Sequence, residues 1–171
     1  MKTKQAVSLV FGALITFAMV PRVLAIENGA AEGTVTVNGK AVTLKFAYAV
    51  AAKGFSDETK DDTVVILSDV PLAPAVLRDK PARRDLEKAG RLHAIEATIN
   101  AEKQPINVTV RDAAFKMPAS GGSTEDLFEA KTFEKGMIAG RLHRKSPGSS
   151  FDDISFTYDV RFKAAVLPRK E

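Results

Sequence analysis

The chain has 171 residues, with 25 Lys and Arg against 21 Asp and Glu, and it contains no Cys. The absence of Cys excludes disulfides, a thiol nucleophile and thiolate metal sites. Three of the basic residues, Lys2, Lys4 and Arg22, precede residue 26, so residues 26–171 hold 22 basic and 21 acidic side chains. A segment so close to neutral gives no support for nucleic-acid binding.

The first 25 residues have the pattern of an export signal. A short basic stretch is followed by an apolar run from Ala6 to Val20, which is short for a membrane span. Val23-Leu24-Ala25 then offers small residues to a signal peptidase. The alternative is a retained membrane anchor. We expect residues 1–25 to be a cleaved signal peptide and residues 26–171 to form a single all-β domain, secreted or periplasmic and without a membrane span.

Residues Gly33 to Ala52 predict a β-hairpin. The Asn38-Gly39 pair at its centre favours a two-residue type I′ turn, which places Val35 opposite Val42. Directly opposed residues share one face of a sheet. The apolar face then continues through Leu44, Phe46, Tyr48 and Val50.

The middle of the chain predicts one strand and one helix. Thr63 to Leu67 is a short apolar run and indicates a central strand. Prolines interrupt the next twenty residues, and Pro81 to Ala89 then forms a short helical pattern. Proline near its start and Gly90 after its end are typical of helix boundaries. We expect this helix to cap an end of the sheet or to cross between two sheets.

Two more hairpins are predicted after the helix. Arg91–Ile99 and Gln104–Arg111 flank a four-residue loop, which would pair Ala97 with Ile106 and Ile95 with Val108. The other hairpin joins Leu127–Phe133 to Met137–Arg144 around Glu134-Lys135-Gly136. Its turn would place Phe128 opposite Leu142 and Glu129 opposite Arg141.

The last strand has the strongest pattern. From Ile154 to Val166 every second residue is apolar and the residues between are mostly polar, as in a strand with one buried face. Thirteen residues would extend about 43 Å, so the strand is expected to bend. The fold class is therefore all-β, an antiparallel β-sandwich or closed barrel of about 8–9 strands with one short helical excursion. The predicted common core is Phe46, Tyr48, Ile66, Ile95, Val108, Phe128, Leu142, Phe156 and Phe162.

The two histidines do not predict a shared site. His93 and His143 each end a copy of the pentapeptide Ala-Gly-Arg-Leu-His, at residues 89–93 and 139–143, but the flanking residues differ. The strand registers place His93 on the inner face and His143 on the outer face. No further ligands stand at zinc spacing, so we assign no metal.

Four pairs of acids are candidates for calcium binding or acid-base catalysis. Each pair lies in a loop or at the start of a strand, where acids commonly solvate a turn. We therefore assign no catalytic, cofactor-binding or metal residue. The pairs are Asp57-Glu58, Asp61-Asp62, Glu125-Asp126 and Asp152-Asp153.

Several strand and turn segments carry a resemblance. They are Val37–Lys40, Phe46–Ala49, Val65–Leu72, Gly90–His93 and Tyr158–Phe162. Together they cover most of residues 26–171, and the chain resembles a group of small secreted bacterial domains that has no assigned activity. The resemblance implies one all-β secreted domain and implies no mechanism.

The sequence predicts a non-enzymatic binding or interaction domain, secreted or periplasmic, without a cofactor. Its partner would be an envelope or extracellular protein or a small ligand, and not nucleic acid. Binding is expected chiefly in the loops Lys53–Asp62, Pro71–Lys80 and Pro118–Asp126, because loops on a rigid scaffold carry recognition. A cavity inside a barrel is the second possibility for a ligand. The alternative function is a small secreted hydrolase that uses Asp152 or Asp153 with a histidine.

Overall fold

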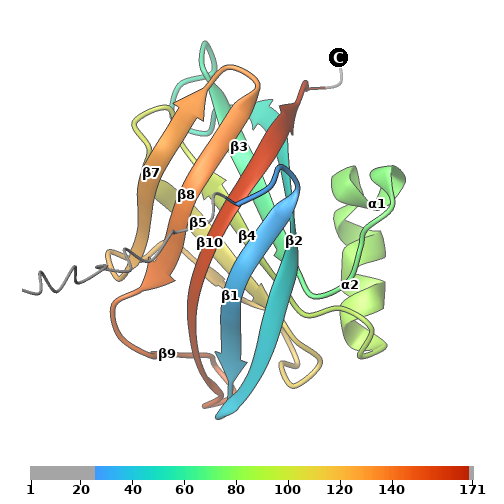
Figure 1. Cartoon of the computed structure of the whole chain (residues 1–171). Coiled ribbons are helices and arrows are strands. Elements are labelled where there is room, and N and C mark those ends of the chain that lie inside the picture. The colour runs from blue at the N-terminus through green and yellow to red at the C-terminus, as the bar shows by residue number, and fades with distance from the viewer. Residues whose placement is uncertain (1–25, 170–171) are drawn as a thin grey trace, which may run out of the picture.

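A computed structural model describes residues 26–169 and contains one large antiparallel sheet with two short helices on its outside (Figure 1). The strands follow the order β6-β5-β4-β3-β2-β1-β10-β8-β7, and β9 pairs with the start of β10. They are β1 (Ala30–Val37), β2 (Lys40–Lys53), β3 (Asp61–Ser68), β4 (Ala94–Ile99), β5 (Pro105–Arg111), β6 (Ala119–Gly121), β7 (Asp126–Glu134), β8 (Met137–Arg144), β9 (Gly148–Ser149) and β10 (Ser155–Leu167).

The sheet curls into a half-barrel around one core. Its two end strands, β6 and β7, do not pair with each other within residues 26–169, so the barrel is not closed by hydrogen bonds. The predicted all-β antiparallel class is confirmed. Of the two architectures expected, the single curled sheet is nearer to the barrel than to a sandwich of two sheets. We call the line along which β6 and β7 approach each other the seam.

The β1–β2 hairpin has the predicted register at its turn and a different one further on. Asn38 and Gly39 both take positive φ, and Val35 lies opposite Val42. The register then shifts between Gly33 and Ala30, which marks a bulge. Beyond it Ala47 and Ala49, rather than Phe46 and Tyr48, belong to the inner core.

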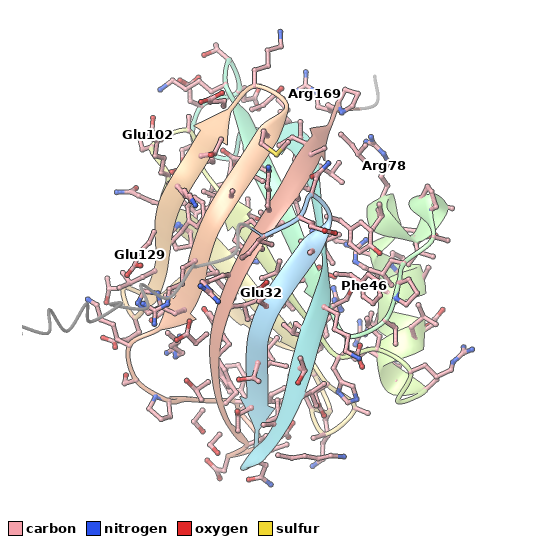
Figure 2. All side chains as sticks on the ribbon, in the orientation of Figure 1. Glu32, Phe46, Arg78, Glu102, Glu129 and Arg169 are labelled. Carbon is pink, nitrogen blue, oxygen red and sulfur yellow. The ribbon has the colours of Figure 1, made fainter. Side chains whose placement is uncertain are left out.

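The predicted place of Phe46, Tyr48 and Ile66 in the common core is therefore wrong. Tyr48 and Ile66 belong to a second apolar cluster on the outside of the sheet. Phe46 belongs to neither cluster and lies on the helix side of β2 (Figure 2). The cause is the bulge, because a shift of one residue turns every later side chain to the opposite face.

The rest of the predicted core is confirmed. Ile95, Val108, Leu142 and Phe162 are buried in the inner cluster, with Phe128 and Phe156 packed against it half-buried. The alternation of β10 supplies much of this core, and its Phe162 ring stacks on Phe128 with 5.8 Å between the ring centroids.

The two later hairpins differ in how well their registers were predicted. In β7–β8, Phe128 lies opposite Leu142 and Glu129 opposite Arg141, as predicted. In β4–β5 the predicted pairs are wrong, because Ala97 lies opposite Val108 and Ile95 opposite Val110. Two local features shift the register by two residues. Asn100 bonds to Gln104 through backbone and side chain, which tightens the loop, and a bulge follows between Thr98 and Ile99.

The helices lie on the outer face of the sheet rather than at its end. Helix α1 (Pro74–Arg78) was not predicted, and α2 (Lys80–Lys88) is the predicted helix within one residue at each end. The second apolar cluster joins them to β2, β3 and β4 through Val50, Ile66 and Leu77 among others. The expected position at an end of the sheet or between two sheets is therefore wrong. Among residues 26–169, no helix has the length and apolar character needed to cross a membrane.

Candidate functional site

A hollow of about 400 Å³ opens at one end of the seam. The curl of the sheet brings its walls together from three parts of the chain. They are β5 and β6 with the residues around β6, the start of β7 with the end of β8, and the segment from β9 to the start of β10. The lining residues are Val108, Met117, Pro118, Ala119, Ser120, Gly121, Gly122, Ser123, Asp126, Arg144, Ser149, Ser150, Phe151, Asp152 and Phe156. We call it the seam hollow.

The base of the seam hollow is a buried polar cluster. Asp126 is 5% exposed and accepts two short hydrogen bonds on Oδ1, from Arg144 Nη1 and from the Tyr158 hydroxyl, each at 2.6 Å. Burial, together with the neighbouring Asp126 carboxylate, raises the pKa of Tyr158 well above its usual range. The phenol therefore stays protonated and acts as a hydrogen-bond donor, not as a base.

Arg144 links this cluster to the apolar wall. Its guanidinium lies over the Phe156 ring, 5.3 Å from the ring centroid, which is a cation-π distance. Its Nε is buried and has no hydrogen-bond partner among the described residues. Arg144 thus presents a fixed cationic group between an acid and an aromatic ring.

The mouth of the seam hollow carries two apolar side chains that face solvent. Phe151 is 98% exposed and Met117 is 58% exposed. Between them, the Lys116 backbone N–H donates to Asp152 Oδ2 at 3.2 Å, which ties the two loops that carry them. Exposed apolar groups beside a hollow mark a recognition surface more often than isolated ones do.

The structure does not bring the two histidines together with this hollow or with each other. His93 lies just before β4, and its Nδ1 is 2.8 Å from Asp112 Oδ2. His143 lies in β8 on the outer face, as predicted, 3.7 Å from Glu129. Neither histidine lines the seam hollow.

Two of the four predicted acid pairs each contribute one residue to the seam hollow, and the other two pairs do not line it. Asp126 and Asp152 both line it. In the remaining pairs, Asp57 accepts hydrogen bonds from Thr59, and Asp62 accepts one from the backbone of Phe55. These two acids hold the loop between β2 and β3, as the turn interpretation predicted.

A buried ionic cluster beneath α2 was missed by the sequence reasoning. Arg83 and Glu87 of α2 meet Glu96 of β4 and Arg111 of β5, and all four are buried. Glu96 accepts from both guanidinium groups, and Arg111 Nη1 also donates to Glu87 at 2.8 Å. The signal available was the i, i+4 spacing of Arg83 and Glu87 on one helix face.

The two carboxyl groups of this ionic cluster respond differently to burial. Burial raises the pKa of Glu87, and its bond with Arg111 only partly offsets this. Burial acts on Glu96 in the same direction, but the hydrogen bonds of Arg111 and Arg83 outweigh it and lower the pKa of Glu96. The ionic cluster thus joins α2 to the sheet in two places, through Arg83 with Glu96 and through Glu87 with Arg111.

Within residues 26–169, no three His, Asp or Glu side chains lie close enough to hold a metal ion. Comparisons with family models, with curated proteins and with solved structures find no match for this chain. The resemblance to small secreted bacterial domains stays a prediction.

Proposed function

We propose that this protein is a secreted or periplasmic, non-enzymatic binding domain that takes an extended segment of another protein in its seam hollow. The observation that carries the proposal is the position of the hollow. It lies at an unpaired edge of the sheet and has exposed apolar side chains at its mouth.

The edge strand β6 favours a polypeptide over other ligands. It pairs with β5 on one side, and within the described residues no strand pairs with its other side. An extended peptide can add to such an edge through backbone hydrogen bonds.

The side chains of the hollow suit an apolar anchor on that peptide. Aromatic residues, Met and Arg are enriched at protein interfaces, and Phe151, Met117 and Arg144 are of these types. Asp126 is engaged by Arg144 and Tyr158, and no histidine lies beside Asp152 in the hollow. These contacts support binding over the hydrolase alternative.

The test is a selection of peptides that bind the protein, followed by affinity measurements on variants. We expect Phe151→Ser and Met117→Ser each to lower the affinity for a selected peptide by about tenfold or more, as loss of an interface anchor does. The matched control is Phe55→Ser. Phe55 is 86% exposed and lies in the β2–β3 loop, at the opposite end of β2 from the seam hollow.

Unchanged affinity in both variants, or an equal loss in the control, would exclude the seam hollow as the binding site. Mass spectrometry of the peptide after incubation tests the alternative function. Cleavage that disappears in a folded Asp152→Asn variant would replace the binding proposal with a hydrolase.

A further inference from the structure

A second hollow, of about 530 Å³, lies between α2 and the outer face of β4, β5 and β6. Two cross-strand rows form its floor. One runs through Glu96, Thr109 and Ser120, and the other through Thr98 and Asn107. We call this hollow the α2 groove.

The floor of the α2 groove is a connected polar surface. Thr109 Oγ1 and Ser120 Oγ are 2.8 Å apart, and Asn107 lies within hydrogen-bond reach of both at 3.4 and 3.3 Å. These contacts fix the hydroxyl and amide groups in place before any ligand arrives. A surface of this kind matches a ligand with several hydroxyl groups.

The wall of the α2 groove supplies positive charge. Lys80 and Arg84 stand one turn apart on α2, and both are exposed and line the groove. Among the described residues neither has a carboxylate within salt-bridge distance. Two acids line the groove, Asp85 and Glu96. Glu96 is paired with Arg83 and Arg111. Lys80 and Arg84 against Asp85 therefore leave the wall with a net positive charge that favours an anion.

The buried ionic cluster gives this arrangement rigidity. Arg83 and Glu87 anchor α2 to Glu96 and Arg111, whose charges balance each other. Lys80 and Arg84 are therefore carried on a helix whose distance from the polar floor is fixed. Preorganised groups of this kind lose less entropy when they bind.

We propose that the α2 groove binds a sugar acid, with the carboxylate between Lys80 and Arg84 and the hydroxyl groups on Thr98, Asn107 and Ser120. No aromatic side chain lines the groove among the described residues, which favours an aliphatic polyol over a nucleobase. This site shares Pro118 and Ser120 with the seam hollow, but its charged wall lies on α2, outside the seam hollow, and the proposal does not depend on the peptide site.

The experiment is calorimetric titration with four probes: glucuronate, an oligomer of glucuronate, glucose and acetate. We expect both uronates to bind and glucose and acetate to bind about tenfold more weakly or not at all, because each lacks one half of the match. An oligomer that binds more tightly than glucuronate would identify a polysaccharide as the source. An oligomer whose affinity per sugar unit equals that of glucuronate would identify the free sugar acid as the ligand.

Variants connect the binding to the groove. The double substitution Lys80→Gln with Arg84→Gln should lower the affinity for glucuronate by about tenfold or more. The control pair Lys88→Gln with Arg91→Gln removes the same charge from exposed residues outside the groove and should leave the affinity unchanged. Thr98→Val, which keeps the shape and the charge, should also weaken binding.

Three results would overturn the proposal. They are no binding of either uronate, equal binding of acetate and glucuronate, and an equal loss in the two charge pairs. A failure here leaves the peptide proposal standing, because its variants lie at Phe151 and Met117.

Discussion

Replacing Glu96 by Gln tests the ionic cluster that fixes α2 to the sheet. Glu96 is buried and accepts bonds from Nε and Nη2 of both Arg83 and Arg111. A Gln has nearly the same shape, but its amide has one acceptor oxygen and one donor nitrogen. One guanidinium group would then face another donor inside the protein.

The expected loss in the free energy of unfolding is about 3–5 kcal/mol, the range found when one partner is removed from a buried ion pair. Urea denaturation followed by circular dichroism measures it. The control is the same substitution at Glu129, which is largely exposed and 3.7 Å from Arg141, and we expect no measurable loss there. A Glu96→Gln loss below about 1 kcal/mol would refute the role assigned to the ionic cluster.

The pH dependence of the stability gives a second test of the ionic cluster. The pKa of Glu96 is lowered on folding. Its contribution to the free energy of unfolding is therefore present above the unfolded pKa of about 4.3 and is lost as the pH falls through the folded pKa. The difference between the protein and Glu96→Gln should shrink in acid. The pKa of Glu87 is raised, so its contribution is present in acid and is lost as the pH rises. The protein should therefore gain stability relative to Glu87→Gln as the pH falls, and the same slope for both variants would contradict the assignment.

Other predictions concern the core, a glycine and export. Phe162→Ala should lower the free energy of unfolding by about 3–5 kcal/mol in urea denaturation, because Phe162 is fully buried, and a loss below about 1 kcal/mol would place it outside the core. Gly33→Ala should cost more than about 1 kcal/mol, since φ is +150° and a Cβ would overlap the Asp159 carbonyl, while Gly121→Ala has open space and should cost less; equal losses would contradict this. Exported protein should begin near Ile26 in N-terminal sequencing, and a membrane-bound form that retains Met1 would contradict a cleaved signal.

Local turn chemistry made part of the fold predictable. A two-residue turn containing Gly sets the β1–β2 register near Asn38, as predicted. Between β7 and β8 the turn is Lys135-Gly136, one residue shorter than predicted, and a bulge between Ala130 and Thr132 restores the predicted pairing of Phe128 with Leu142. Alternation along β10 then identified which of its faces is buried. These features depend on residues that are close in the chain, so the sequence alone was enough to find them.

Bulges and sheet closure were not predictable in the same way. The bulge in the β1–β2 pair moves Phe46 and Tyr48 to the outer face, although their alternation with Leu44 is unbroken in the sequence. Gly33, with a positive φ, lies at this bulge, and a glycine inside a strand often marks one, but the alternation of apolar residues does not show it.

The candidate site was predicted only in fragments. The loop Pro118–Asp126 and the acid Asp152 were both named from the sequence, and both line the seam hollow. Their meeting depends on the loop between β9 and β10, which lies against the residues before β6 and whose Asp152 accepts a hydrogen bond from Lys116, 36 positions away in the chain. The hydrogen bond between Tyr158 and Asp126 also joins residues 32 positions apart in the chain.

The most direct test of the peptide site is amide hydrogen exchange on the protein with a selected peptide bound. Addition of a strand to β6 predicts slower exchange at Ala119–Gly121 and in the loop that carries Phe151. The β2–β3 loop around Phe55 should exchange at its free rate. Protection confined to that loop, or no change along β6 at saturating peptide, would contradict the proposed function.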